Sequence, residues 1–258
     1  MITQSELALL LTSRRARERL LVDAGDDWAP VRLRQLQISA RIAAHKRREA
    51  VARWYPATVA ACDASSRLRS LVDDLVQEPL PFGAPDRRAR CGDALAAALR
   101  KQHVEPRLGT ALLELLRLEG AIVRLTYHPP ETVVAACVSP GAPVRDVSIS
   151  SRVRLAPTVR LLRFAVDVLA LREQPQAVEA LVDAVSIGPG TVVALVRRRA
   201  LQPVQLVRLG PGAMALLTAC ARHDRGVADL IGSFPAGSRE AALASVRQAA
   251  AAGLLETA

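Results

Sequence analysis

The scarcity of aromatic residues is the feature that most limits the fold of this chain. Phe, Trp and Tyr make up 3% of 258 residues, although half of the residues are apolar. A chain of this length and apolar content can bury a sizeable core. That core must be built from Leu, Val and Ala, a composition that favours helices over a sandwich or barrel. We expect an α+β, mostly helical fold.

The first half of the chain is expected to form a helical N-terminal domain at residues 1–138. A candidate capping box, Thr3 to Glu6, precedes a run of leucines and opens a helix that ends near Gly25. Further helices are predicted at 31–55, 66–77, 86–102 and 105–125. Thr132–Val138 is a short β-branched run, and the Pro-, Gly- and Ser-rich segment 139–151 is typical of an interdomain connection.

The second half, 152–258, is expected to form a small winged-helix-like α+β domain. Predicted strands lie at 153–155, 191–198 and 204–209, the last two joined as a hairpin. Predicted helices lie at 159–172, 176–185, 211–222, 227–234 and 239–252. Pro211 suits a first helical turn, and Gly253 ends the last helix.

The net charge of +10 leaves two interpretations open. Thirty-five basic residues against 25 acidic ones suit a nucleic acid or an acidic partner. However, Lys46 and Lys101 are the only lysines, and the many arginines and alanines are also what GC-rich coding DNA would produce.

No catalytic or metal-binding motif is present in the sequence. The histidines lie in separate segments, at His45, His103, His128 and His223, and the cysteines are equally scattered, at Cys62, Cys91, Cys137 and Cys220. Neither set has the spacing of a zinc or redox site, so we expect buried thiols, no metal, no cofactor and no enzymatic activity. The apolar run Leu7–Leu11 is too short for a signal peptide or membrane helix, which predicts a cytoplasmic protein.

A basic stretch of the predicted helix 31–55 is the best candidate for contact with an acidic partner. Arg41, His45 and Arg48 share one helix face by their i+4 and i+3 spacing. A solvated helix face is the alternative. The candidate partner-binding residues are Arg41, His45, Lys46, Arg48, Trp54 and Tyr55.

Several stretches follow one another in an order that resembles a known family. They are Arg107–Glu119 (RLGTALLELLRLE), Val153–Leu171 (VRLAPTVRLLRFAVDVLAL), Val193–Arg197 (VALVR) and Pro203–Leu217 (PVQLVRLGPGAMALL). The chain resembles the so-called DNA-binding-domain proteins encoded beside multinuclear non-haem iron-dependent oxidases. Members of that family include the partner protein of the methanobactin cassette, which the basic stretch from Lys46 to Pro56 also resembles.

The resemblance implies a helical N-terminal domain and a C-terminal domain similar to peptide-recognition winged helices. In that family the oxidase carries the iron and oxidises cysteines of a ribosomally made precursor peptide. The partner protein forms a heterodimer with the oxidase and presents the peptide. The chain departs from the family pattern at Leu171-Arg172-Glu173, where a tryptophan often closes the phrase, and in its many arginines.

The predicted hairpin is the expected place for a leader peptide to bind. An unpaired outer strand accepts an extended peptide as an added strand, through main-chain hydrogen bonds. Which strand is the free edge is left open. The candidate peptide-binding residues are Val192, Val193, Leu195, Arg197, Val204, Leu206 and Arg208.

A DNA-binding regulator is the alternative, because a positive charge and a winged helix also suit phosphate contact. The expected recognition helix, 211–222, argues against it. This segment has no Arg, Asn or Gln before Arg222, and those side chains are the usual readers of base edges.

Overall fold

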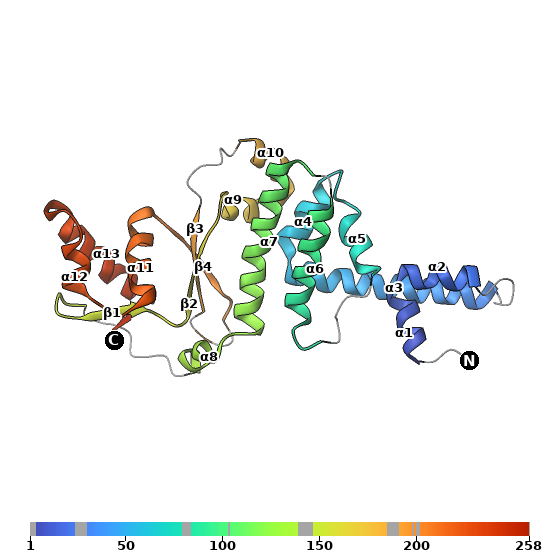
Figure 1. The fold of residues 1–258 in the computed structure, drawn as a ribbon, viewed down its shortest axis with the longest axis horizontal. Coiled ribbons are helices and arrows are strands. Elements are labelled where there is room, and N and C mark those ends of the chain that lie inside the picture. Colours follow the sequence, from blue (N-terminus) through green and yellow to red (C-terminus); the bar gives the residue numbers. More distant parts are fainter. Residues whose placement is uncertain are drawn as a thin grey trace. The chain divides into compact units, whose positions relative to one another are not determined.

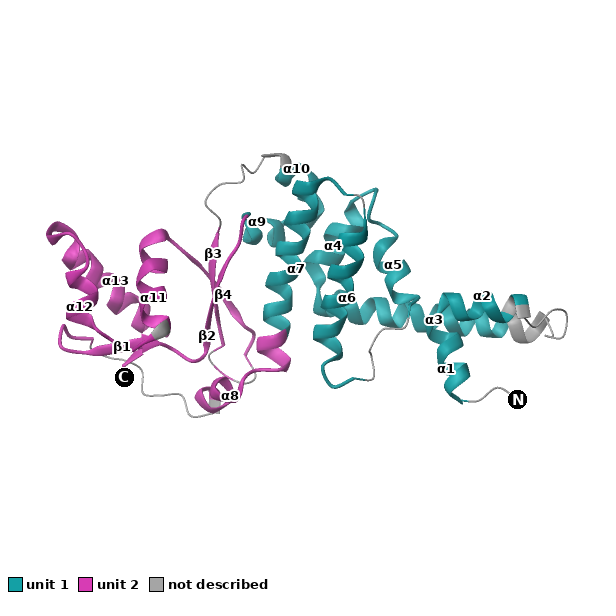
Figure 2. Ribbon diagram, viewed as in Figure 1, with its two compact units in different colours: residues 1–123, 166–188 teal, residues 124–165, 189–258 magenta. Residues whose placement is uncertain are grey.

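The fold comes from a computed structural model that describes residues 4–23, 30–78, 84–102, 104–138, 147–184, 191–197, 199 and 202–257. It is mostly helical, with two small antiparallel sheets (Figure 1). Contacts divide the chain into two compact units (Figure 2). Unit 1 holds residues 1–123 and 166–188, and unit 2 holds residues 124–165 and 189–258.

The described part of unit 1 is helical. Its helices are α1 (Gln4–Thr12), α2 (Arg14–Asp23), α3 (Pro30–Trp54), α4 (Pro56–Ala64), α5 (Leu71–Val76), α6 (Arg87–Lys101), most of α7 (Pro106–Tyr127), α9 (Val168–Glu173), the 3₁₀ helix η2 (Pro175–Ala177) and α10 (Val178–Ala184). The predicted helices at 31–55, 86–102 and 105–125 are confirmed to within two residues. The predicted helix 66–77 is shorter and begins only at Leu71.

The helix predicted to run from the capping box to Gly25 is wrong, because the chain breaks at Ser13. The buried Ser13 accepts a hydrogen bond from the amide of Ala16 at 3.2 Å, which caps α2. Arg17 donates at 2.9 Å to the carbonyl of Leu10 in the last turn of α1. Thr3 and Gly25 lie outside the described residues.

Helix α4 lies in the centre of unit 1 and begins against a buried carboxylate from α7. Its N-cap, Tyr55, makes no side-chain capping bond. Glu119 of α7 replaces the cap: it accepts from the amides of Ala57 and Thr58 at 2.8 and 2.9 Å and from the Thr58 hydroxyl at 2.6 Å. Burial raises the pKa of Glu119, and these three hydrogen bonds oppose that rise.

Small residues let α4 pack on several neighbours at once. Ala57, Val59, Ala61 and Cys62 are all buried, and α4 contacts α3, α5, α9 and η2. Helix α9 and η2, far along the sequence, therefore pack on α4 within unit 1.

Tyr55, which joins α3 to α4, is fully buried. Its hydroxyl donates at 2.7 Å to the carbonyl of Arg88, at the start of α6. Gly92, one turn further along α6, lies directly against the ring: a Cβ there would lie 2.7 Å from Cζ of Tyr55. The buried tyrosine therefore requires glycine at this position.

Unit 2 combines two three-stranded sheets with helices. Its elements are the end of α7, α8 (Glu131–Val138), β1 (Arg152–Leu155), β2 (Val159–Arg163), β3 (Val192–Val196), β4 (Gln205–Leu209), α11 (Pro211–Arg222), β5 (Arg225–Gly226), α12 (Val227–Gly232), η3 (Ala236–Ser238), α13 (Arg239–Ala251) and β6 (Leu255–Thr257). The strand orders are β5-β1-β6 and β2-β3-β4, with all neighbours antiparallel. The β-branched run Thr132–Val138 lies in helix α8.

The predicted helix 159–172 is wrong in its first part. Residues 159–163 form β2, in which Val159 pairs with Val196 and Arg163 with Val192. Helix α9 begins only after Asp167, whose carboxylate accepts from the amide of Ala170. The apolar pattern of residues 159–163 fits either structure, and pairing with β3 favours the strand.

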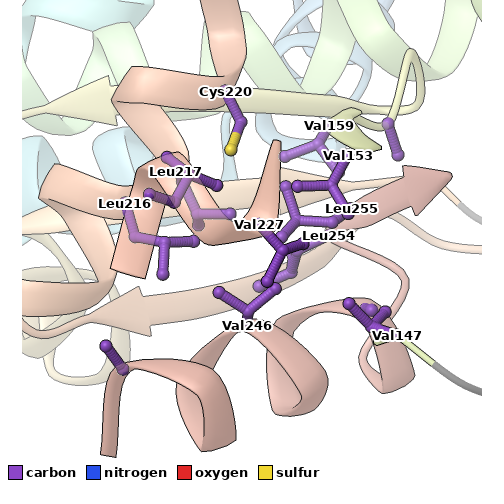
Figure 3. Close-up of a cluster of buried hydrophobic side chains, with 14 of the residues drawn as sticks. Val147, Val153, Val159, Leu216, Leu217, Cys220, Val227, Val246, Leu254 and Leu255 are labelled. Atoms are coloured by element: carbon purple, nitrogen blue, oxygen red, sulfur yellow. The ribbon is translucent and has the colours of Figure 1, made fainter. Parts of the chain in front are cut away.

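The core of unit 2 forms where α11 and α13 meet the sheet β5-β1-β6. Leu216 and Leu217 of α11, Val246 of α13 and Val153 of β1 point into one cluster (Figure 3). At the end of α13, Gly253 adopts a φ of 69°, and the amide of Leu254 bonds back to the carbonyl of Ala249 at 2.9 Å. This turn brings Leu254 and Leu255 into the cluster.

The domain limits 1–138 and 152–258 stay a prediction, because compact units need not be independently folding domains. Segment 166–188 belongs to unit 1, so the chain passes between the two units three times. Within the described residues, no helix is both long and apolar enough to cross a membrane.

Replacing Glu119 by alanine should destabilise unit 1 by about 3 kcal/mol or more, because three buried donors lose their acceptor. Chemical denaturation of the full chain measures this loss. Glu114→Ala on the same helix is the control. Within the described residues, Glu114 makes only a local ion pair with Arg117, at 3.0 Å, and its removal should cost about 0.5 kcal/mol. Equal losses would contradict the capping role of Glu119.

Gly92→Ala should cost about 1–3 kcal/mol, because the new methyl group overlaps the buried Tyr55 ring. Gly120→Ala is the matched helical control: apart from its chain neighbours and the backbone of its own helix, no described atom lies within 4 Å of the added Cβ. It should stabilise the chain by up to about 1 kcal/mol. Thermal denaturation of both variants decides the point, and a stabilising Gly92→Ala would argue against the packing described for Tyr55.

Candidate functional site

Strand β3 does not supply a free edge, which decides a question about the hairpin that the sequence left open. It lies between β2 and β4, and both of its edges are paired. Its residues Val192–Val196 are all buried, which includes the candidates Val192, Val193 and Leu195. A peptide therefore has no access to the main chain of β3.

Strand β4 ends its sheet in the described part of the chain, and its register shows which groups point outward. In the β2–β3 pair, the amide of Arg197 donates to the carbonyl of Thr158 at 3.1 Å. Because antiparallel bonding alternates along a strand, Ala194 bonds to its partner Val207 on the other side of β3. The N–H and C=O of Leu206, one residue before Val207, consequently point away from β3.

A cavity of about 220 Å³ lies beside β4, between this strand and helices α11 and α13. Val207 and Leu209 of β4, Leu216 of α11 and Ala249 of α13 are among its mostly apolar walls. Arg208, which is exposed, is the one charged residue in the lining. Small-molecule sites usually have about 300–1,000 Å³, so this cavity suits one or two side chains. The candidates Val204 and Leu206 are half-buried.

Arg197, another candidate peptide-binding residue, has a structural position. It is 8% exposed, and its guanidinium donates to the carbonyl of Leu125 at the end of α7. Its own carbonyl accepts from the Cys137 thiol at 3.3 Å. These contacts join β3 to α7 and α8 and keep Arg197 out of contact with a ligand at β4.

The structure brings together the three residues expected on one face of α3. Arg41, His45 and Arg48 all line one cavity in unit 1, whereas the exposed Lys46 lies outside its lining. Arg48 binds Asp63 at 2.6 Å and Asp73 at 2.7 Å. Its charge is therefore used within unit 1.

The aromatic end of the expected basic face is corrected. Tyr55 is 0% exposed and bonded to α6, so it cannot contact a partner. Trp54 is half-buried, with the guanidinium carbon of Arg88 5.6 Å from its ring centroid. The partner-binding role of the remaining residues stays a prediction.

Sequence reasoning missed two arginines of α2, Arg14 and Arg17, that line the same cavity. Nothing in their spacing relative to Arg41 indicates that they share a site, because only the packing of the helices brings them there.

The four cysteines are buried, as expected. Burial raises the pKa of Cys62 to about 12 and those of Cys91 and Cys220 to about 11. A thiol needs the opposite shift to become a nucleophile at neutral pH.

Among the described residues, no group of three or more His, Cys, Asp or Glu side chains is placed to hold a metal ion. In comparisons with known proteins, no family model and no curated protein matches the chain.

In the native protein, Cys62, Cys91 and Cys220 should resist alkylation, because at about pH 8 only about one thiol in a thousand or fewer is ionised. Iodoacetamide treatment followed by peptide mass spectrometry measures this protection. The same treatment in guanidinium chloride is the control and should label all of them. Rapid native labelling of any of the three would contradict the buried environment.

Proposed function

We propose that this chain is a non-catalytic partner protein that binds the leader of a ribosomally made precursor peptide along β4. In this proposal it forms a heterodimer with a multinuclear iron-dependent oxidase, which carries the iron and modifies cysteines of the peptide. The oxidase rests on the resemblance of stretches such as Arg107–Glu119 and Pro203–Leu217 to partner proteins of such enzymes. The peptide site rests on the edge strand β4 and the cavity beside it.

Strand addition explains how β4 would hold a peptide. An added strand gains main-chain hydrogen bonds from the outward N–H and C=O of Leu206 with little demand on its sequence. Side chains alternate between the two faces of a strand. Those on the same face as Val207 and Leu209 would therefore lie over the cavity.

The lining of the cavity indicates which peptide would fit. Its apolar walls favour an aliphatic or aromatic side chain. An extended leader with one apolar anchor matches this lining.

Unit 2 offers less support for DNA binding than for peptide binding. Helix α13 follows the short α12 in the chain. In a winged helix, the helix at this position is the recognition helix. Its exposed residues Ala241, Ala244 and Ser245 offer little to base edges, which leaves Arg239 and Gln248 at its two ends and Arg247 as possible contacts. Arg247, a stronger candidate, donates to the carbonyl of Val147 at 3.1 Å. In α11, the expected recognition helix, Leu216 and Leu217 are committed to the core.

Leu206→Pro should weaken binding of a labelled leader peptide about fivefold, because proline removes the outward N–H and with it about 1 kcal/mol of hydrogen bonding. Proline is tolerated on an edge strand when that N–H faces solvent. Leu206→Ala is the matched control, since it shortens the side chain but keeps the donor. Fluorescence anisotropy with the leader encoded beside the oxidase measures both.

A substitution that fills the cavity tests peptide binding independently of Leu206. Ala249→Met should weaken binding of the leader peptide, whereas Ala244→Met on the exposed face of α13 should leave peptide binding unchanged. Duplex DNA titrated at near-physiological salt tests the alternative. The proposal fails if the wild-type chain forms no complex with the oxidase or leader, or if it binds duplex DNA in a sequence-dependent, salt-resistant way.

A further inference from the structure

The second cavity, in unit 1, has the size and the charge of an anion site. It lies among α2, α3 and α5. Its volume of about 760 Å³ is within the range of small-molecule sites. Four arginines line it, Arg14, Arg17, Arg41 and Arg48, and Asp73 is the one carboxylate in its lining.

Two of these arginines are left without a carboxylate partner within the described residues. Arg48 is neutralised by two aspartates, and Arg14 forms an ion pair with Glu18 at 2.8 Å. Arg17 donates only to the carbonyl of Leu10. Arg41 is exposed and forms no ion pair with any of the described residues. The excess positive charge of the cavity therefore belongs to Arg17 and Arg41.

A further arginine of α3, Arg47, lies outside the cavity lining but close enough to Arg17 for their charges to interact. Arg47 is 8% exposed, and its Nη atoms donate to the carbonyls of Thr12 and Leu11 at 3.3 and 3.4 Å. Its buried Nε has no partner among the described residues. Burial and the charge of Arg17 lower the pKa of Arg47. Like charges gathered at a partly buried site repel each other, and a bound anion would relieve that repulsion.

We propose that this cavity binds a small ligand carrying a multiply charged oxyanion of the phosphate class. Guanidinium groups bind such oxygens through paired N–H donors, and Arg17 and Arg41 both line the cavity. Gln37 and Gln77 add neutral donors to the lining, and Val76 gives an apolar wall for an uncharged part of the ligand. This inference concerns unit 1 and does not rest on the peptide site of unit 2.

Titration calorimetry of the full chain with inorganic pyrophosphate and with ADP tests the proposal. Arg41→Gln should weaken both ligands about tenfold, because one charge-assisted contact is lost. Arg53→Gln is the matched control: it removes the same charge from an exposed position on the same helix, outside the cavity. It should leave both affinities within about twofold.

The two ligands separate the possible sources of the anion. Tighter binding of ADP would assign the site to an organic phosphate, and equal binding would assign it to the phosphate group alone. No binding of either ligand to the wild-type chain would overturn the proposal. Equal weakening by Arg41→Gln and Arg53→Gln would also overturn it, because attraction to the overall charge would then suffice. Circular dichroism of both variants checks that the helices are intact.

Discussion

The hydrogen bonds that the buried Glu119 carboxylate accepts from the start of α4 are the interaction on which unit 1 depends. A helix that starts inside a protein must satisfy its first amides, and α4 starts at Pro56 without a cap of its own. Glu119 supplies the acceptor from a different helix, and so fixes where α4 begins relative to α7. Helix α9 and η2 then pack on α4, so the position of a late part of the chain depends on this early contact.

A core with few aromatic residues depends on close packing of small side chains. Helix α4 presents alanines, valine and Cys62 to several neighbours, and Gly92 lets the ring of Tyr55 lie directly against α6. In unit 2, β3 is likewise built from valine, alanine and leucine, and it is buried along its whole length. Burying β3 in the middle of its sheet leaves the more polar β4 at an edge of that sheet within the described residues.

The arginines serve the fold as well as the surface. Arg17, Arg47 and Arg197 all donate to main-chain carbonyls at or near helix ends, where the last C=O groups have no partner within the helix. Arg48 joins α3 to two aspartates. The guanidinium groups of Arg47, Arg48 and Arg197 are therefore engaged within the protein. The charge that remains uncompensated at Arg17 and Arg41 lies in one cavity rather than along a helix that enters a groove.

The sequence by itself determined the mostly helical character, the limits of α3, α6, α7, α11 and α13, the turn at Gly253 and the burial of the cysteines. These features depend on local signals, namely apolar periodicity, proline, glycine and side-chain polarity. Only the tertiary structure decided that residues 159–163 form a strand, that β3 is central, that Tyr55 is buried and that Arg14 and Arg17 share a cavity with Arg41. Each of these outcomes depends on a partner tens of residues away, and neither periodicity nor spacing identifies that partner.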